Sequence, residues 1–137
     1  MGYFCRSNRR VRPPERFTDL EANETTPVTS HDGRTLAYRA LYPGPSFRET
    51  IRLVHVGTGM LSGEIELPSP VRFNVTGIDF SEDDRHLVFG ADATDVGGSL
   101  QNVHGEIFSI DLDGTHLTRL TRNKAFDGYP VSLVRAR

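Results

Sequence analysis

Five histidines are the side chains of this sequence best suited to bind a metal ion or to transfer a proton: His31, His55, His86, His104 and His116. None stands in an HxH, HxxxH or HExxH arrangement, the spacings that bring two imidazoles to one metal ion. His31, His104 and His116 also fall in expected turns, where a solvated histidine is the ordinary case. The histidines therefore predict no metal site.

Carboxylates offer a second route to metal binding. Asp92 and Asp95 lie among glycines in the long segment 91–105, and carboxylate oxygens are ligands that Ca²⁺ accepts. Asp-x-x-Asp in a long loop more often serves local turn chemistry, which is the favoured interpretation. Residues 111–114, Asp-Leu-Asp-Gly, resemble the start of a calcium-binding loop but lack its closing Glu, so we expect a β-hairpin there.

Motifs for enzymatic catalysis are missing from the sequence. It contains no Gly-x-Ser-x-Gly nucleophile elbow and no phosphate-binding lysine motif. Gly57, Gly59 and Gly63 are spaced as in some nucleotide-binding loops, but the following residues 64–67 have a strand pattern and not the helix that such a site needs. We expect no catalytic residues, no cofactor and no enzymatic activity from this chain.

The segment Phe126-Asp127-Gly128-Tyr129-Pro130 is the most distinctive loop. Asp-Gly turns the chain, Pro suits an edge position, and the aromatic rings can pack beneath neighbouring strands. That structural interpretation is favoured. The alternative is a ligand-facing loop, in which Phe126, Asp127 and Tyr129 are the candidate binding residues.

Composition limits the class of partner. The net charge of −2 and the pI of about 6.2 create no field that favours nucleic acid. Cys5 is the single cysteine, which excludes an internal disulfide, and no apolar run approaches the roughly 18 residues of a membrane span. Residues 1–26 carry several arginines and Pro13-Pro14; we expect a flexible, solvated, basic segment, with contact to phosphates or acidic lipid as the alternative.

The elements that position these residues are short strands. Apolar alternation predicts strands at 77–80, 86–90, 106–112 and 117–121. Turn-forming residues 81–84 separate the first pair, and Asp113-Gly114 is a strong hairpin signal between the last pair. An antiparallel meander of four strands is one blade of a β-propeller, so the sequence predicts an all-β fold.

The same pattern occurs twice along the chain. Ser30, Asp32, Arg34 and Leu36 match Ser81, Asp83, Arg85 and Leu87, an offset of 51 residues. A repeat of this length, built from four strands, is typical of propellers. We therefore expect a first blade at 27–76, a second blade at 77–130 and the truncated start of a further blade at 131–137.

The repeated motifs carry a family resemblance over about residues 27–130. The turn Ser81-x-Asp83-x-Arg85, the hairpin Asp-Leu-Asp-Gly at 111–114 and Leu-Thr at 120–121 resemble the WD40-like (PD40) repeat of TolB-like β-propellers. The family pattern at the turn is close to Ser-Pro-Asp-Gly-Lys/Arg. His31 and Glu82 replace the proline here, and Asp84 replaces the glycine.

The resemblance implies a non-catalytic, protein-binding scaffold, in TolB a periplasmic partner of an outer-membrane lipoprotein. An alternative is a remnant of the propeller domain of a prolyl-oligopeptidase-like serine peptidase, and a third is a small β-sandwich that binds protein or sugar. Family propellers have more blades than two, so we expect a fragment. Two blades alone should be marginally stable, associate with copies of themselves through open blade edges, or close as a small two-sheet sandwich. No signal peptide is visible, which leaves periplasm and cytoplasm both open.

Overall fold

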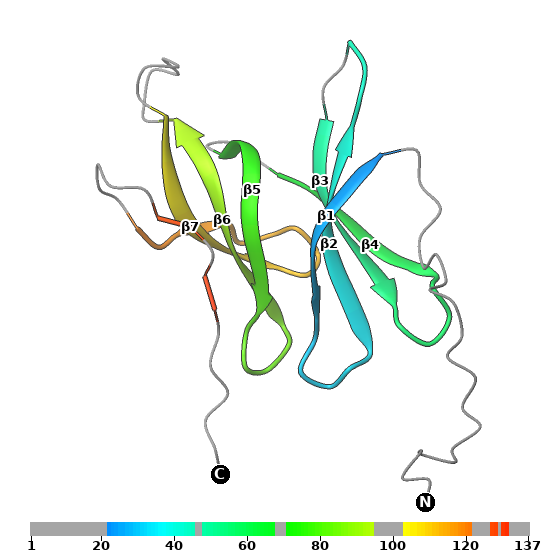
Figure 1. The fold of residues 1–137 in the computed structure, drawn as a ribbon. Helices are drawn as coiled ribbons and strands as arrows, with labels where there is room; N and C mark the ends of the chain where they lie inside the picture. Colours follow the sequence, from blue (N-terminus) through cyan, green and yellow to red (C-terminus); the bar gives the residue numbers. More distant parts are fainter. Residues whose placement is uncertain are drawn as a thin grey trace, which may run out of the picture.

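The computed structural model describes residues 22–45, 48–67, 71–94, 103–121, 127–128 and 130–131. These residues form two antiparallel sheets of four strands each (Figure 1). The first sheet contains β1 (Asn23–Thr29), β2 (Thr35–Tyr42), β3 (Arg48–His55) and β4 (Leu61–Glu66), and the second contains β5 (Val71–Phe80), β6 (His86–Thr94), β7 (Val103–Asp111) and β8 (Thr118–Arg119). Each sheet pairs its strands in chain order, as a propeller blade does. The predicted fold class, all-β with about two blades, is confirmed.

The turn between β1 and β2 explains why its residue types recur in the sequence. The Ser30 hydroxyl donates to the Asp32 carboxylate at 2.6 Å and accepts from the Thr35 amide at 3.0 Å. The Asp32 carboxylate also accepts from the Arg34 amide at 2.9 Å. The hydrogen bond from Ser30 lowers the pKa of Asp32 below its usual value, with the Arg34 amide as the next cause.

The turn between β5 and β6 repeats this arrangement. Ser81 donates to Asp83 at 2.6 Å and accepts from the His86 amide at 3.0 Å. Asp83 accepts from the Arg85 amide at 3.1 Å. The serine and aspartate at each turn therefore satisfy backbone donors that the tight turn leaves unpaired, and the repeat is confirmed as a structural unit.

The Asp113-Gly114 hairpin is also confirmed. Asp111 and Thr115 pair through their backbones at 3.0 Å, and Gly114 has the positive φ of 86° that such a turn requires. A Cβ at Gly114 would lie 3.6 Å from the Ile65 methyl Cγ2. The hairpin of the second sheet thus lies against β4 of the first.

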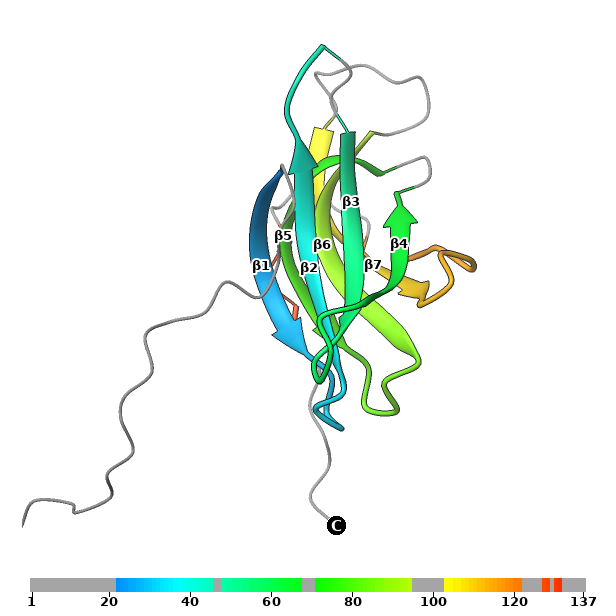
Figure 2. The same ribbon diagram turned by 90° about the vertical axis from the view of Figure 1, so that its right-hand side faces the viewer.

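The two sheets stack face to face, one in front of the other in the rotated view (Figure 2). They share one apolar core. Ala37, Ile51, Leu53 and Ile65 come from the first sheet, and Val75, Ile78, Phe80, Leu87, Phe89, Ala91, Phe108 and Ile110 from the second. The rings of Phe89 and Phe108, paired across β6 and β7, stack with centroids 5.6 Å apart. Burial of these side chains is the main force that holds one blade on the other.

Glu49 joins the two sheets beside this core. Its carboxylate accepts from Arg39 Nε at 2.6 Å within the first sheet. It also accepts from the backbone amides of Asn74 and Val75 in β5, both at 2.7 Å. The Glu49 side chain is only 3% exposed. A buried carboxylate is tolerated here because its oxygens are hydrogen-bonded.

The opposite face of the first sheet carries a second, smaller cluster. It contains Tyr38, Ala40 and Val54, with Ala22, Leu36 and Tyr42 packed against it. A polar network adjoins this cluster: the Tyr42 hydroxyl donates to Glu64 at 2.6 Å, and Arg52 Nη1 donates to Tyr42 at 2.9 Å and to Glu64 at 3.2 Å.

Strand bounds differ from the sequence prediction at several places. β6 runs on to Thr94 where the prediction ended at 90, and β7 spans Val103–Asp111 where the prediction had 106–112. β1 starts at Asn23, ahead of the expected start of the first blade at 27. β5 starts at Val71, ahead of the predicted strand at 77–80, so residues 71–76 belong to the second sheet. Both added stretches contain register shifts and a positive φ, 53° at Thr26 and 63° at Asn74. Such bulges break the alternation by which strands are recognised. β8 is shorter than predicted.

No helix long and apolar enough to cross a bilayer occurs in the part of the chain that the structure describes.

Candidate functional site

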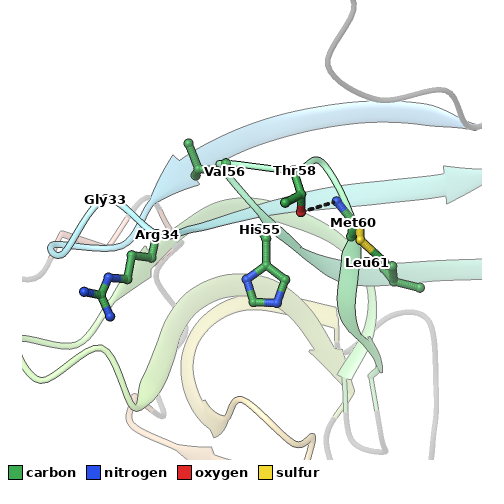
Figure 3. A pocket seen from close by; sticks show the side chains of 8 residues that line it. Gly33, Arg34, His55, Val56, Thr58, Met60 and Leu61 are labelled. Carbon is green, nitrogen blue, oxygen red and sulfur yellow. Dashed lines mark hydrogen bonds between the residues drawn. The ribbon is translucent and has the colours of Figure 1, made fainter.

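An open depression of about 730 Å³ lies at the end of the first sheet where β1 turns into β2 and β3 into β4 (Figure 3). Its lining consists of Gly33, Arg34, His55, Val56, Gly57, Thr58, Met60 and Leu61. Met60 is 66% exposed, Leu61 50% and Val56 38%. Three large, exposed apolar side chains thus line one open hollow.

The connection between β3 and β4 builds most of this depression. The His55 amide donates to the Met60 carbonyl at 2.9 Å, and the Gly59 amide donates to the His55 carbonyl at 2.7 Å. Gly59 has a positive φ of 70° that suits glycine. The Met60 amide donates to the Thr58 hydroxyl oxygen at 3.2 Å, the dashed line in Figure 3. This closed turn presents Met60 and Leu61 to solvent.

The turn between β1 and β2 supplies the other wall. The Val56 amide donates to the Arg34 carbonyl at 2.9 Å, which joins this turn to the β3–β4 connection. Figure 3 shows the Arg34 guanidinium extending away from the apolar side chains. An apolar hollow with a few polar groups at its rim suits contact with the apolar side chain of another molecule.

A separate cluster of ionisable groups lies at the end of the second sheet. The Asp111 carboxylate lies within hydrogen-bonding distance of two imidazoles, 2.6 Å from His86 Nδ1 and 2.8 Å from His116 Nδ1. The hydrogen bond to His116, followed by that to His86, lowers the pKa of Asp111 below its usual value. His86 and Asp111 are directly paired in the β6–β7 register. This cluster was not predicted from the sequence; pairing the predicted strands 86–90 and 106–112 as antiparallel neighbours is the step that places His86 opposite Asp111.

Metal binding gains no support from these groups. Among the described residues, no three or more His, Cys, Asp or Glu side chains are grouped closely enough to hold a metal ion. Asp92 lies 3.4 Å from the Asn74 side-chain amide, and Asp95 falls outside the described residues.

The predicted binding loop is described only in part. The Asp127 amide donates to the Gly105 carbonyl in β7 at 2.9 Å, so Asp127 lies beside β7. Phe126 and Tyr129 lie outside the described residues. The proposed role of this loop in ligand binding stays a prediction.

Comparison with known proteins supports the fold alone. One solved structure, Kuenenia stuttgartiensis hydrazine synthase, which contains β-propeller domains, matches 74% of this chain with a TM-score of 0.52 and 15% sequence identity. The match spans 30% of that chain, so this sequence corresponds to a minor part of it. No family model and no curated protein matches the sequence.

Proposed function

We propose that this chain is a non-catalytic, protein-binding scaffold built from TolB-like propeller blades. The observation that carries the proposal is the depression at the end of the first sheet, where Val56, Met60 and Leu61 are exposed together. Exposed apolar side chains grouped around a hollow, on turns held by a rigid sheet, are typical of protein-binding surfaces.

The partner that fits this surface is a protein segment with one apolar anchor side chain. Such an anchor would contact Met60 and Leu61, and Arg34 and His55 would stand beside it as polar groups. Burial of a few apolar side chains at the centre of a contact commonly supplies most of its binding energy.

A site-specific photo-crosslinker tests this proposal. The crosslinking amino acid is placed at Met60, in the connection before β4, and in a matched control at Glu66, at the far end of β4, whose side chain is 70% exposed. A defined protein should be crosslinked from position 60 and not from position 66, and Leu61→Glu should abolish the crosslink. Equal labelling from both positions, or labelling unaffected by Leu61→Glu, would refute the proposed surface.

A further inference from the structure

Two of the three departures from the family pattern at the blade turns, His31 and Asp84, lie against each other in space. Asp84 occupies the position of Gly33 in the other copy and has the same left-handed backbone, with φ of 58° against 73°. Most residues with a side chain avoid this conformation, although Asp and Asn tolerate it better. The Asp84 side chain therefore occupies a backbone position that glycine would fill without strain.

The Asp84 carboxylate reaches from the second blade to the first. Its Oδ1 accepts from the His31 amide at 2.8 Å and lies 2.9 Å from His31 Nδ1. Its Oδ2 accepts from the Asp32 amide at 3.0 Å. The His31 side chain is 28% exposed and the Asp84 side chain 18%, so water competes only partly for their hydrogen bond.

His31 is suited to this contact in two respects. A proline at position 31 would have no backbone N–H to donate, whereas histidine supplies both that amide and an imidazole nitrogen. The replacement of proline by His31 and of glycine by Asp84 thus creates the donor and the acceptor of one contact between blades.

We infer that His31 and Asp84 form a latch between the two blades that is strongest when the His31 imidazole is protonated, and that this latch fixes the turn whose Gly33 and Arg34 line the depression. The latch acts on the wall of the depression because His31, Asp32, Gly33 and Arg34 are consecutive residues of one turn.

The electrostatic surroundings support the dependence on protonation. The hydrogen bond to Asp84 is the largest cause that raises the pKa of His31, and the charges of Asp84 and Asp79 and the Ser81 backbone act in the same direction. Desolvation opposes this shift. Asp84 and Asp79 are the carboxylates that face His31 from the second sheet, and Asp32 and Arg34 are the charged groups of its own turn.

The sign of the pH effect follows from this raised pKa. The stabilisation by protonated His31 is fully present below the usual histidine pKa of 6.5 and is lost as the pH rises through the higher value in the folded chain. The two backbone amide bonds to Asp84 do not depend on the imidazole. Deprotonation therefore weakens the latch without removing it.

An NMR titration of the full chain tests the latch. The imidazole resonances of His31 and His55 are followed with pH in the wild type and in Asp84→Asn, a change that keeps the side-chain shape and suits a left-handed backbone. We expect the His31 midpoint to fall in Asp84→Asn and the His55 midpoint to stay unchanged. An unchanged His31 midpoint would overturn the latch.

A second NMR measurement tests whether the latch affects the wall of the depression. In the wild type, the backbone amide shifts of Gly33 and Arg34 should titrate with the His31 midpoint, and in His31→Gln this titration should disappear. His31→Gln keeps the backbone amide that donates to Asp84, so the turn should remain folded. Amide shifts that titrate equally in both proteins would contradict the proposed control of the wall, whether or not the depression binds a protein.

Discussion

Replacement of Glu49 by alanine should be among the most damaging single changes at the contact between the blades. The Glu49 carboxylate binds Arg39 within the first sheet and the amides of Asn74 and Val75 in the second. Glu49→Ala leaves two backbone donors and one guanidinium without their acceptor. The site is nearly closed to water because the Glu49 side chain is 3% exposed and the Arg39 side chain 18%.

The expected loss in the free energy of unfolding follows from these contacts. Removal of one partner from a buried ion pair costs about 3–5 kcal/mol, and buried donors left unpaired add to that range. Arg39 is partly exposed and recovers some hydration, so we expect a loss of about 3 kcal/mol in the free energy of unfolding. That loss is large beside the total stability of about 5–15 kcal/mol that is common for a domain.

Urea denaturation of the wild type and of Glu49→Ala measures this loss. The matched control is Glu66→Ala, because Glu66 also pairs with an arginine, Arg48, but is 70% exposed. An exposed ion pair contributes about 0–1 kcal/mol, so the control should be nearly as stable as the wild type. A loss below about 1 kcal/mol for Glu49→Ala, or equal losses in the two variants, would refute the reasoning.

Three further changes test other parts of the structure. Phe89→Ala removes one of two stacked rings in the core and should cost about 3–5 kcal/mol by thermal or urea unfolding; a loss below 1 kcal/mol would mean that the ring is not buried. Gly33→Ala, at φ 73°, should cost about 1 kcal/mol by the same measurement, whereas Gly57→Ala, at ordinary φ and in equally open space, should be nearly neutral; similar effects would contradict the turn geometry. The lowered pKa of Asp111 stabilises the chain above the usual aspartate value, and this stabilisation is lost as the pH falls through the folded value. His86→Gln should therefore raise the Asp111 midpoint in an NMR titration, and an unchanged midpoint would refute the pairing.

The turns and the hairpin could be predicted from the sequence because their hydrogen bonds join residues that are close together in the chain. Ser81 and Asp83 bond within their own turn, and Asp113-Gly114 closes its own hairpin. Residue types at fixed spacings therefore predicted the turns, the strands between them and the repeat. The all-β, two-blade fold followed from these local elements.

Contacts between residues far apart in the sequence could not be predicted in this way. Nothing in the sequence marks Glu49, because its partners in β5, Asn74 and Val75, are distant along the chain. Asp84 was identified only as a replacement of the family's glycine, and its contact with His31 became visible in the structure. The early starts of β1 and β5 were missed because Thr26 and Asn74 interrupt the alternation with a positive φ. The depression arises from two connections separated by a whole hairpin, and only the pairing of the strands brings them together.

Nuclear Overhauser contacts test most directly whether the second sheet stacks on the first. In a chain with labelled methyl groups, the Ile65 Cγ2 methyl should show a contact to the Gly114 α protons, because a Cβ on Gly114 would lie 3.6 Å from that methyl carbon. Contacts between the methyl groups of Ile51 or Leu53 and the aromatic rings of the second sheet should accompany it, since these side chains share one core. Methyl contacts confined to residues within each sheet would contradict the stacked arrangement.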